Sequence, residues 1–179
     1  MIENEIEKKA LITEEQYSTL SENIAGGSVK ITQINYYFDT EDRALSNKKE
    51  TLRIRQIENR LEVQFKYGRT MDQGNLISKE FCEEISFLPE SILVNGFRTC
   101  NIGFLITERT KVEFDAYTVF LDKNYYFGKV DYEIEVEAAD VRNMPDELFG
   151  IKFNDKCRGK YTRFINELLN QKGSYEISK

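Results

Sequence analysis

Charged and apolar residues alternate along most extended segments of this chain, and this pattern constrains the fold more than any other feature. Because alternate side chains of a β-strand lie on one face, each segment has a charged face and an apolar face. In residues 2–11 (IENEIEKKAL), the side chains of Glu3, Glu5, Glu7 and Lys9 share a face. The alternation recurs at residues 52–56 (LRIRQ), 61–67 (LEVQFKY), 107–117 (TERTKVEFDAY) and 131–138 (DYEIEVEA). The chain is therefore predicted to build a sheet with one strongly charged face.

Strand-like segments follow one another for most of the chain, with few helical segments between them. The first helix is predicted between Thr13, which has Gln16 three residues later as in a capping box, and Gly26–Gly27. Three more helices are predicted, over residues 88–97, 144–154 and 159–172. This order predicts one α+β domain over residues 1–179 with an antiparallel sheet, and not a series of βαβ units.

Histidine is absent from the 179 residues, which excludes histidine-based acid–base catalysis and histidine-ligated transition metals. A bound metal would then be a hard cation held by oxygen atoms, with Mg²⁺ or Mn²⁺ as the first candidates. The three cysteines, Cys82, Cys100 and Cys157, are odd in number and widely spaced, so they indicate neither a disulfide framework nor a zinc site.

The overall charge and hydropathy of the chain limit its partners. A net charge of −6 argues against a general affinity for nucleic acid. No apolar run approaches the roughly 18 residues that cross a bilayer, and the N-terminus lacks the basic start and apolar core of a signal peptide. These features predict a cytoplasmic protein without a nucleic-acid or membrane partner.

The charged strand faces fit two architectures. In the first, an open antiparallel sheet packs its apolar face on helices and exposes its charged face to water. In the second, the sheet curls so that the charged faces look inward at one another and helices cover the apolar outside. Burying such charges costs several kcal/mol per ion unless partners compensate, which a polyanion and divalent cations would do. The alternation alone leaves both architectures open.

Seven segments of the chain occur in the order and spacing of the CYTH family, which includes class IV adenylate cyclases and thiamine triphosphatases and is also called the triphosphate tunnel metalloenzymes. These segments are EIEKK, YYFDT, LRIR, FK, FLDKNYYFG, DYEIEVE and KYTRF. The chain resembles the small, single-domain bacterial members over residues 2–170. This resemblance implies an eight-stranded antiparallel closed β-barrel with a charged interior and helices packed outside. Such barrels often form homodimers, although no exposed apolar strip in the sequence points to one.

The resemblance implies a set of basic residues that binds the phosphates of a triphosphate substrate. The family pattern E-x-E-x-K supplies Lys9, and the paired arginines of the family fall on Arg53 and Arg55. The full set comprises Lys9, Arg53, Arg55, Lys66, Arg109, Lys111, Lys160 and Arg163. Arginine holds phosphate oxygens in bidentate fashion and lysine holds them as a point charge, so this set suits a linear triphosphate.

The resemblance also implies acidic metal ligands and a catalytic group. The ligands expected for Mg²⁺ or Mn²⁺ are Glu5, Glu7, Asp122, Glu133 and Glu135. The catalytic residues are expected to be Lys9, Glu5 and Glu7. With no histidine in the chain, activation of water would fall to the metal or to Lys9, if basic neighbours lower the pKa of this lysine. Three acidic residues extend the charged faces without motif support and are expected at strand ends or at the rim: Glu113, Asp115 and Glu137.

Some positions depart from the family pattern. Where the family often has R-x-E-x-E, this chain has Ser78, Glu80 and Cys82, so that Glu80 alone carries over as a candidate. Gly159 replaces a serine that is frequent before the tyrosine of the final helix. One of two neighbouring tyrosines, Tyr36 or Tyr37, is a further candidate for assisting catalysis. A buried tyrosine, however, more often belongs to a hydrophobic core.

Three functions are consistent with these residues, each with a triphosphate-containing small molecule as the partner. The first is metal-dependent hydrolysis of inorganic triphosphate, thiamine triphosphate or a nucleoside triphosphate in the basic tunnel. The second is a class IV type adenylate cyclase that makes cyclic AMP from ATP, although no segment indicates an adenine pocket. The third is a protein that binds polyphosphate or nucleotides without catalysis.

Overall fold

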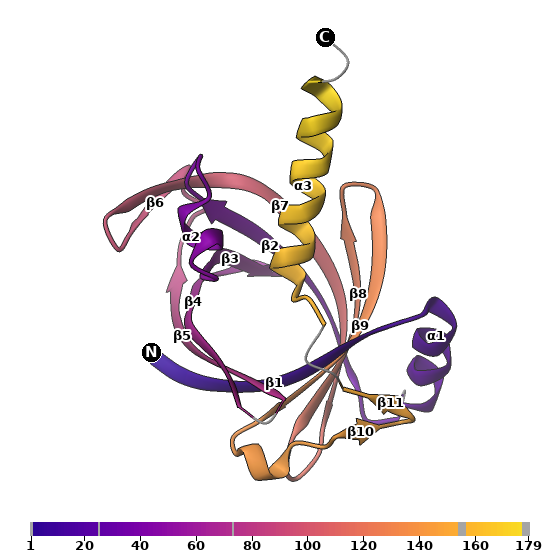
Figure 1. Cartoon of the computed structure of the whole chain (residues 1–179). Coiled ribbons are helices and arrows are strands. Elements are labelled where there is room, and N and C mark those ends of the chain that lie inside the picture. Colours follow the sequence, from indigo (N-terminus) through magenta and orange to yellow (C-terminus); the bar gives the residue numbers. More distant parts are fainter. Residues whose placement is uncertain (1, 25, 73, 154–156, 177–179) are drawn as a thin grey trace.

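A single antiparallel sheet curls on itself and closes into a barrel, because the strands at the two ends of the barrel order pair with each other (Figure 1). This computed structural model describes residues 2–24, 26–72, 74–153 and 157–176. Within them, eight strands form the barrel: β1 (Ile2–Ile12), β2 (Val29–Asp39), β3 (Thr51–Ile57), β4 (Arg60–Asp72), β5 (Asn75–Ile85), β7 (Phe97–Glu113), β8 (Thr118–Tyr126) and β9 (Lys129–Ala138). Their order is β2-β3-β4-β5-β1-β9-β8-β7, and β7 pairs back with β2. The predicted eight-stranded closed barrel is confirmed.

The helices lie outside the ring of strands (Figure 1): α1 (Glu14–Asn23), α2 (Ala44–Asn47), the 3-10 helix η1 (Val141–Asn143) and α3 (Lys160–Glu176). The helix predicted after Thr13 is α1, and its capping box forms. The N–H of Gln16 donates to Thr13 Oγ1 at 3.1 Å, and the N–H of Thr13 donates to Gln16 Oε1 at 2.9 Å. The predicted terminal helix is α3. No helix of the described residues is long and apolar enough to span a membrane.

The outward, apolar faces of the strands pack in two clusters. Leu20 of α1 shares a cluster with Val136 of β9. Leu45 of α2 shares the other with Leu52 of β3. A third cluster, which joins Tyr37 of β2 to Phe164 of α3, lies on the inward side of the barrel, because Tyr37 also lines the interior. Because removal of apolar surface from water drives this packing, the opposite, charged faces of the strands look inward. Of the two architectures that the alternation leaves open, the curled sheet with a charged interior is the right one.

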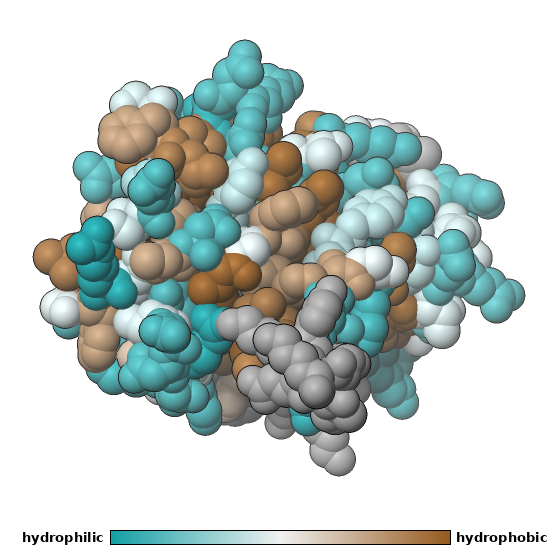
Figure 2. All heavy atoms as spheres, turned by 90° about the horizontal axis from the view of Figure 1, so that it is seen from above, coloured by the Kyte–Doolittle hydropathy of each residue, from teal (hydrophilic) through white to brown (hydrophobic). Residues whose placement is uncertain are grey.

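The outer surface mixes polar and apolar side chains, in contrast with the interior. Figure 2 views the molecule from above and shows brown apolar patches between teal polar side chains on that face. The exposed apolar side chains include Phe87, Leu93 and Phe104. Buried charged side chains instead belong to barrel strands and to the start of α3: Glu7, Lys8, Asp39, Lys66, Arg109, Asp122, Glu133, Glu135 and Lys160.

The short helix predicted over residues 88–97 is wrong, because this segment forms a β-hairpin. The strand β6 (Ser91–Val94) pairs with the first residues of β7, beyond the closed part of the barrel. Asn95 and Gly96, which connect the two strands, both have positive φ angles, of 49° and 81°. An Asn-Gly pair with two positive φ angles is typical of a two-residue hairpin turn, and here it outweighs the helical pattern on which the prediction for residues 88–97 rested.

The short helix predicted over residues 144–154 is also wrong, as far as residue 153; residue 154 lies outside the described residues. The strands β10 (Glu147–Leu148) and β11 (Ile151–Lys152) pair in a small antiparallel sheet. Phe149 and Gly150 turn the chain between them with positive φ angles of 52° and 75°. Glycine adopts this conformation without steric cost, which favours the turn over a continuing helix.

Gly103 in β7 leaves no room for a side chain beneath α3. Its φ is 134°, and an added Cβ would lie 2.9 Å from Cζ of Phe164. We expect Gly103→Ala to lower the free energy of unfolding by about 1–3 kcal/mol, because the Cβ is strained and overpacks that ring. Thermal unfolding followed by circular dichroism measures the loss. Gly26→Ala is the matched control, since a Cβ there meets nothing within 4 Å. Equal melting temperatures for the two variants would contradict the prediction.

Candidate functional site: the charged cavity of the barrel

The inward faces of the strands enclose a cavity of about 340 Å³, which is within the usual size of small-molecule sites. All eight barrel strands and the start of α3 contribute side chains to its wall. The predicted site residues that line it are Glu5, Glu7, Lys9, Tyr37, Arg53, Arg55, Lys66, Glu80, Arg109, Lys111, Glu135 and Lys160. Three others join this lining through ion pairs: Asp122, Glu133 and Arg163.

Glu5, Glu7 and Glu137 form an acidic cluster in the cavity wall. The antiparallel pairing of β1 with β9 places Glu7 opposite Glu137, and Glu5 precedes Glu7 by two residues on the same face. Each of the three offers a carboxylate oxygen, and these oxygens lie within 4.8 Å of one another. Glu137 stands near the end of β9 as expected, but it also lines the cavity, a role for which the charged alternation of DYEIEVEA was the only signal.

The cluster holds more negative charge than the surrounding cations balance. Burial raises the pKa of Glu7 to about 8; Lys9 opposes this rise and Glu135 adds to it. Burial likewise raises the pKa of Glu137 to about 7, with further contributions from Glu135 and Glu5. Among the described residues, the buried Oε2 of Glu7 has no hydrogen-bond partner. The cluster therefore suits an additional cation.

Lys9 lies among carboxylates and keeps its charge. Its Nζ lies 2.7 Å from Glu7 Oε1 and 3.4 Å from Glu135 Oε1. Burial acts to lower the pKa of Lys9, but Glu135 and Glu7 raise it well above its ordinary value. The prediction that basic neighbours lower this pKa is therefore wrong, because the strand next to β1 presents carboxylates to Lys9.

Asp122, Glu133 and Glu135 form a second acidic cluster, which basic side chains already neutralise. Arg109 donates from Nε and Nη2 to the two carboxylate oxygens of Asp122, at 2.8 and 2.7 Å. Lys160 Nζ lies 2.8 Å from Asp122 and 3.1 Å from Glu135, and it also pairs with Glu133. Although burial acts to raise it, the pKa of Asp122 is lowered by Arg109 and Lys160. This cluster has its charge balanced within the protein.

The guanidinium groups of Arg53 and Arg55 line the cavity with little compensation. Arg55 Nε donates to Asn35 Oδ1 at 3.1 Å, and no carboxylate of the described residues forms an ion pair with Arg55. Burial, Arg53 and Arg109 together lower the pKa of Arg55 to about 9. The nearest carboxylate oxygen paired with Arg53 is Glu80 Oε1, at 3.6 Å from Nη2. An anion in the cavity would find unused guanidinium donors here.

Lys66 lies between the basic wall and the first acidic cluster. Its Nζ donates to Glu5 Oε1 at 2.6 Å and lies 3.7 Å from Glu80 Oε1. Ser78, one of the departures from the family pattern, donates from Oγ to Glu5 Oε2 at 3.3 Å. Burial acts to raise the pKa of Glu5, but Lys66 lowers it, so Glu5 is the charged member of the first cluster.

Lys111 marks the rim of the cavity. Its Nζ lies 2.6 Å from Glu113 Oε1, and the side chain of Lys111 remains 35% exposed. Glu113 is the last residue of β7 and Asp115 follows in the turn; both are exposed, in agreement with the expectation for strand ends.

The two candidate tyrosines lie on opposite faces of β2. On the outer face, Tyr36 donates from its hydroxyl to Gln56 Oε1 at 3.1 Å and packs near Phe104. Tyr37 is fully buried, lines the cavity and packs its ring against Tyr161. Within the described part of the chain, the buried hydroxyl of Tyr37 has no hydrogen-bond partner. Of the pair, Tyr37 is the one placed to contact a ligand.

The start of α3 lies between the cavity and a second hollow of about 520 Å³. Gly159 and Lys160 line the cavity, Arg163 lines the second hollow, and Cys157 lines both. Gly159, which replaces a serine that is frequent in the family, therefore lies at the cavity wall. Arg163, predicted as a substrate-binding residue, is placed outside the cavity itself.

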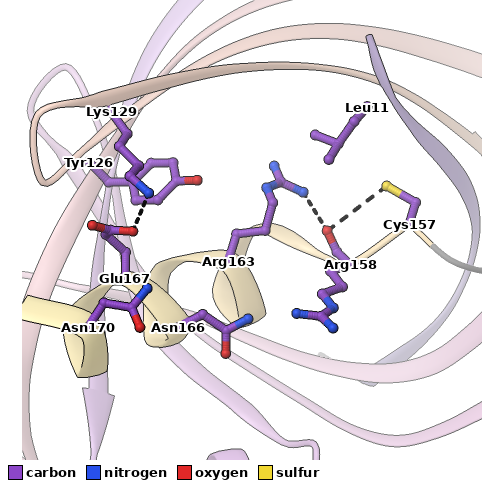
Figure 3. A pocket seen from close by; sticks show the side chains of 9 residues that line it. All are labelled: Leu11, Tyr126, Lys129, Cys157, Arg158, Arg163, Asn166, Glu167 and Asn170. Carbon is purple, nitrogen blue, oxygen red and sulfur yellow. Dashed lines mark hydrogen bonds and ion pairs between the residues drawn. The ribbon is translucent and has the colours of Figure 1, made fainter. Parts of the chain in front are cut away.

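Figure 3 shows the second hollow, with Arg163 rising from α3 among the side chains that line it. Arg163 donates from Nε to Asp131 Oδ2 at 2.8 Å and from Nη1 to Glu133 Oε2 at 2.7 Å. Lys129, at the other side of the view, pairs with Glu167 at 2.5 Å. These cations already have acidic partners, whereas Arg55 of the main cavity has no carboxylate partner among the described residues.

Sequence comparison relates the chain to known proteins over most of its length. The sequence profile of the CYTH domain matches residues 3–156. The chain belongs to the CYTH family. A CYTH-related protein of Bacillus subtilis (strain 168), named "Putative triphosphatase YjbK", is 32% identical over 152 residues, covering 77% of this chain and 79% of YjbK.

Solved structures share the CYTH barrel at lower sequence identity. HpAC1 from Hippeastrum, named as an adenylyl cyclase and described as having a dominant triphosphatase activity, superposes with a TM-score of 0.71 at 20% identity, covering 91% of this chain and 96% of HpAC1. A Bacillus halodurans protein named as an adenylate cyclase superposes with a TM-score of 0.64 at 22% identity, covering 95% of this chain and 90% of its own. At these identities the two likenesses establish the fold alone.

Proposed function

We propose that this CYTH protein hydrolyses a triphosphate within the barrel, with the help of a divalent metal ion. The observation that carries the proposal is that one enclosed cavity contains two opposite unmet charges. Arg55 has no carboxylate partner among the described residues, and Arg53 has only Glu80 at 3.6 Å, whereas Glu7 and Glu137 lack sufficient cationic partners. A triphosphate together with a divalent cation would satisfy both. The relation to YjbK, which bears the name of a triphosphatase, supports this choice of substrate class.

Glu5, Glu7 and Glu137 are the residues that we expect to hold Mg²⁺ or Mn²⁺. Their carboxylate oxygens converge, and one of them, Glu7 Oε2, is buried without a partner among the described residues. We expect Asp122 and Glu133 to take less part than the sequence suggested, because basic side chains balance them. A bound ion would bridge phosphate oxygens and offset the charge that develops on them.

The basic residues of the wall would bind and orient the substrate. Arg53 and Arg55 point unused donors into the cavity, and Arg109 and Lys66 add positive charge between them and the acidic clusters. Lys9, whose pKa is raised, would hold a phosphate oxygen as an ammonium group and would not act as a base. The hydroxyl of Tyr37 would donate a hydrogen bond to the same anion.

We propose that the protein acts in the cytoplasm on a small triphosphate and without a nucleic-acid or membrane partner. The net charge of −6 supports this, because it places the basic groups in a local cavity of an acidic protein. Pairing of two copies, as in other barrels of this family, is tested by light scattering of the purified protein.

Incubation of the purified protein with inorganic triphosphate, thiamine triphosphate and ATP, each with Mg²⁺ or Mn²⁺, tests the proposal. We expect phosphate release from at least one triphosphate in the presence of metal and none in the presence of a chelator. Cyclic AMP formed from ATP would replace the hydrolase assignment with the cyclase. Tight binding of triphosphate without any turnover would replace it with a non-catalytic binder.

Metal binding is expected to release protons near neutral pH. Because the pKa of Glu7 is raised to about 8 and that of Glu137 to about 7, both carboxyls largely hold protons in the metal-free protein at about pH 6. Affinity for Mn²⁺ should therefore rise between about pH 6 and about pH 9. Without metal, these groups destabilise the fold as the pH rises, because the native state binds protons that the unfolded state has lost.

Titration calorimetry in two buffers of different ionisation enthalpy counts the released protons. We expect the apparent enthalpy of Mn²⁺ binding at about pH 6.5 to depend on the buffer, because the buffer takes up the protons that the ligands lose. An enthalpy that is the same in both buffers would show that the metal does not displace these protons.

A further inference from the structure

Arg69 of β4 lines the cavity although strict alternation would turn it outward. Lys66 faces the cavity, so an unbroken strand would turn the residue three positions later away from it. The pairing of β4 with β5 shifts register between Tyr67 and Thr70, and Gly68 within the shift has a φ of 63°. A bulge of this kind re-aims the next side chain, which explains why Arg69 reaches the interior.

The guanidinium of Arg69 has unused hydrogen-bond donors. Its Nη2 donates to Thr51 Oγ1 at 2.8 Å, and Thr51 is itself only 3% exposed. Its Nε is buried and has no hydrogen-bond partner among the described residues. No carboxylate in the described part of the chain forms an ion pair with Arg69. A guanidinium carries five N–H donors and no acceptor, so these donors require an anion or water.

Arg69 extends a row of guanidiniums along β3. Thr51, Arg53 and Arg55 occupy alternate positions of this strand and all line the cavity. Successive members are therefore about 6.6 Å apart along the strand. Thr51 holds the guanidinium of Arg69 at its own end of this row. The guanidiniums of Arg69, Arg53 and Arg55 therefore follow one another along β3. In such a row, two guanidiniums could contact neighbouring phosphates of a linear substrate, and the third would be available for one phosphate more.

We propose that Arg69 binds the third phosphate of a linear polyphosphate and makes the cavity selective for chains of three phosphates over chains of two. This inference rests on the proposed function, since it assigns the row of arginines to phosphate binding. Thr51 is the positioning residue that fixes the guanidinium of Arg69. Pyrophosphate, with two phosphates, is expected to use Arg53 and Arg55 without Arg69.

Titration calorimetry with inorganic triphosphate and with pyrophosphate, both in the presence of Mg²⁺, tests the inference. Arg69→Ala is expected to weaken triphosphate binding about tenfold, the effect of losing a charge-assisted contact, and to change pyrophosphate binding less than about twofold. Arg69→Lys should lose less than Arg69→Ala, because it keeps a point charge. Arg60→Ala is the matched control on the same strand, since the side chain of Arg60 is 78% exposed, and it should bind both ligands as the wild type does.

The comparison of two ligands separates substrate binding from a structural role. Equal losses for triphosphate and pyrophosphate, or no loss for either, would overturn the role of Arg69 and leave the proposed function standing. A wild-type protein that does not bind triphosphate would overturn both. If Arg69→Ala does not fold, Thr51→Val replaces it, because that variant removes only the hydroxyl that positions the guanidinium. It should likewise weaken triphosphate binding more than pyrophosphate binding.

Discussion

Replacement of Glu7 by glutamine is expected to reduce metal-dependent phosphate release from triphosphate by at least about a hundredfold, because a bound metal ion supplies several kcal/mol of transition-state stabilisation. Glutamine keeps the shape of the side chain and removes its anionic ligand. The fold should tolerate the change, since burial raises the pKa of Glu7 to about 8 and the metal-free protein already holds an uncharged group there at neutral pH. Phosphate release as a function of Mn²⁺ concentration measures the effect.

Glu84→Gln is the matched control for this experiment. The side chain of Glu84 is 62% exposed, pairs with Arg60 at 3.1 Å and takes no part in the cavity wall. We expect this variant to release phosphate at the wild-type rate. A wild-type rate for Glu7→Gln at every Mn²⁺ concentration would remove Glu7 from the ligand set. The melting temperatures of both variants show whether a lost rate reflects a lost fold.

Replacement of Lys160 by methionine is expected to lower the free energy of unfolding by about 3–5 kcal/mol, because it removes a cation that three buried carboxylates share and leaves their negative charge under-compensated. The ammonium group of Lys160 contacts Asp122, Glu133 and Glu135, and the first two are fully buried. For a chain of this size, the melting temperature should fall by roughly 6–20 °C. Chemical denaturation with urea gives the free energy, and differential scanning calorimetry gives the melting temperature.

A second substitution shows whether the lost stability is electrostatic. Glu133→Gln in the Lys160→Met background should recover part of the loss, because it removes one of the buried negative charges that the lost ammonium group balanced. Lys30→Met is the control for the loss of an exposed lysine, and it should stay within about 0.5 kcal/mol of the wild type. The explanation fails if Lys160→Met is as stable as Lys30→Met, or if the double variant is the least stable of the set.

The sequence indicated the two faces of each strand more securely than the closure of the sheet. Alternation assigned Arg53 and Arg55 to one side of β3 and Leu52 to the other, and both assignments hold. Closure depends on the pairing of β2 with β7, in which Asn35 stands opposite Leu105. No local sequence pattern indicates a contact between segments so far apart in the chain. The closed barrel was therefore predicted only from the resemblance to CYTH proteins.

The site residues that were missed depend on local geometry or on neighbouring strands. Arg69 enters the cavity through a register shift near Gly68, which periodicity cannot reveal because a bulge interrupts the period. The pKa of Lys9 was predicted with the wrong sign, because its direction depends on Glu135, which only the pairing of β1 with β9 brings close. Glu137 continued a visible alternation, but the set of metal ligands expected from the family resemblance ended at Glu135.

The late position of Lys160 in the chain bears on the synthesis of the protein. Its partner Glu133 leaves the ribosome 27 residues earlier, together with the other carboxylates of β8 and β9. Until α3 follows, a closed barrel would bury these carboxylates with Arg109 but without the ammonium group of Lys160, and an under-compensated buried charge is costly. We therefore expect the barrel to close only after α3 has been synthesised, and until then the apolar faces of its strands would be available to chaperones.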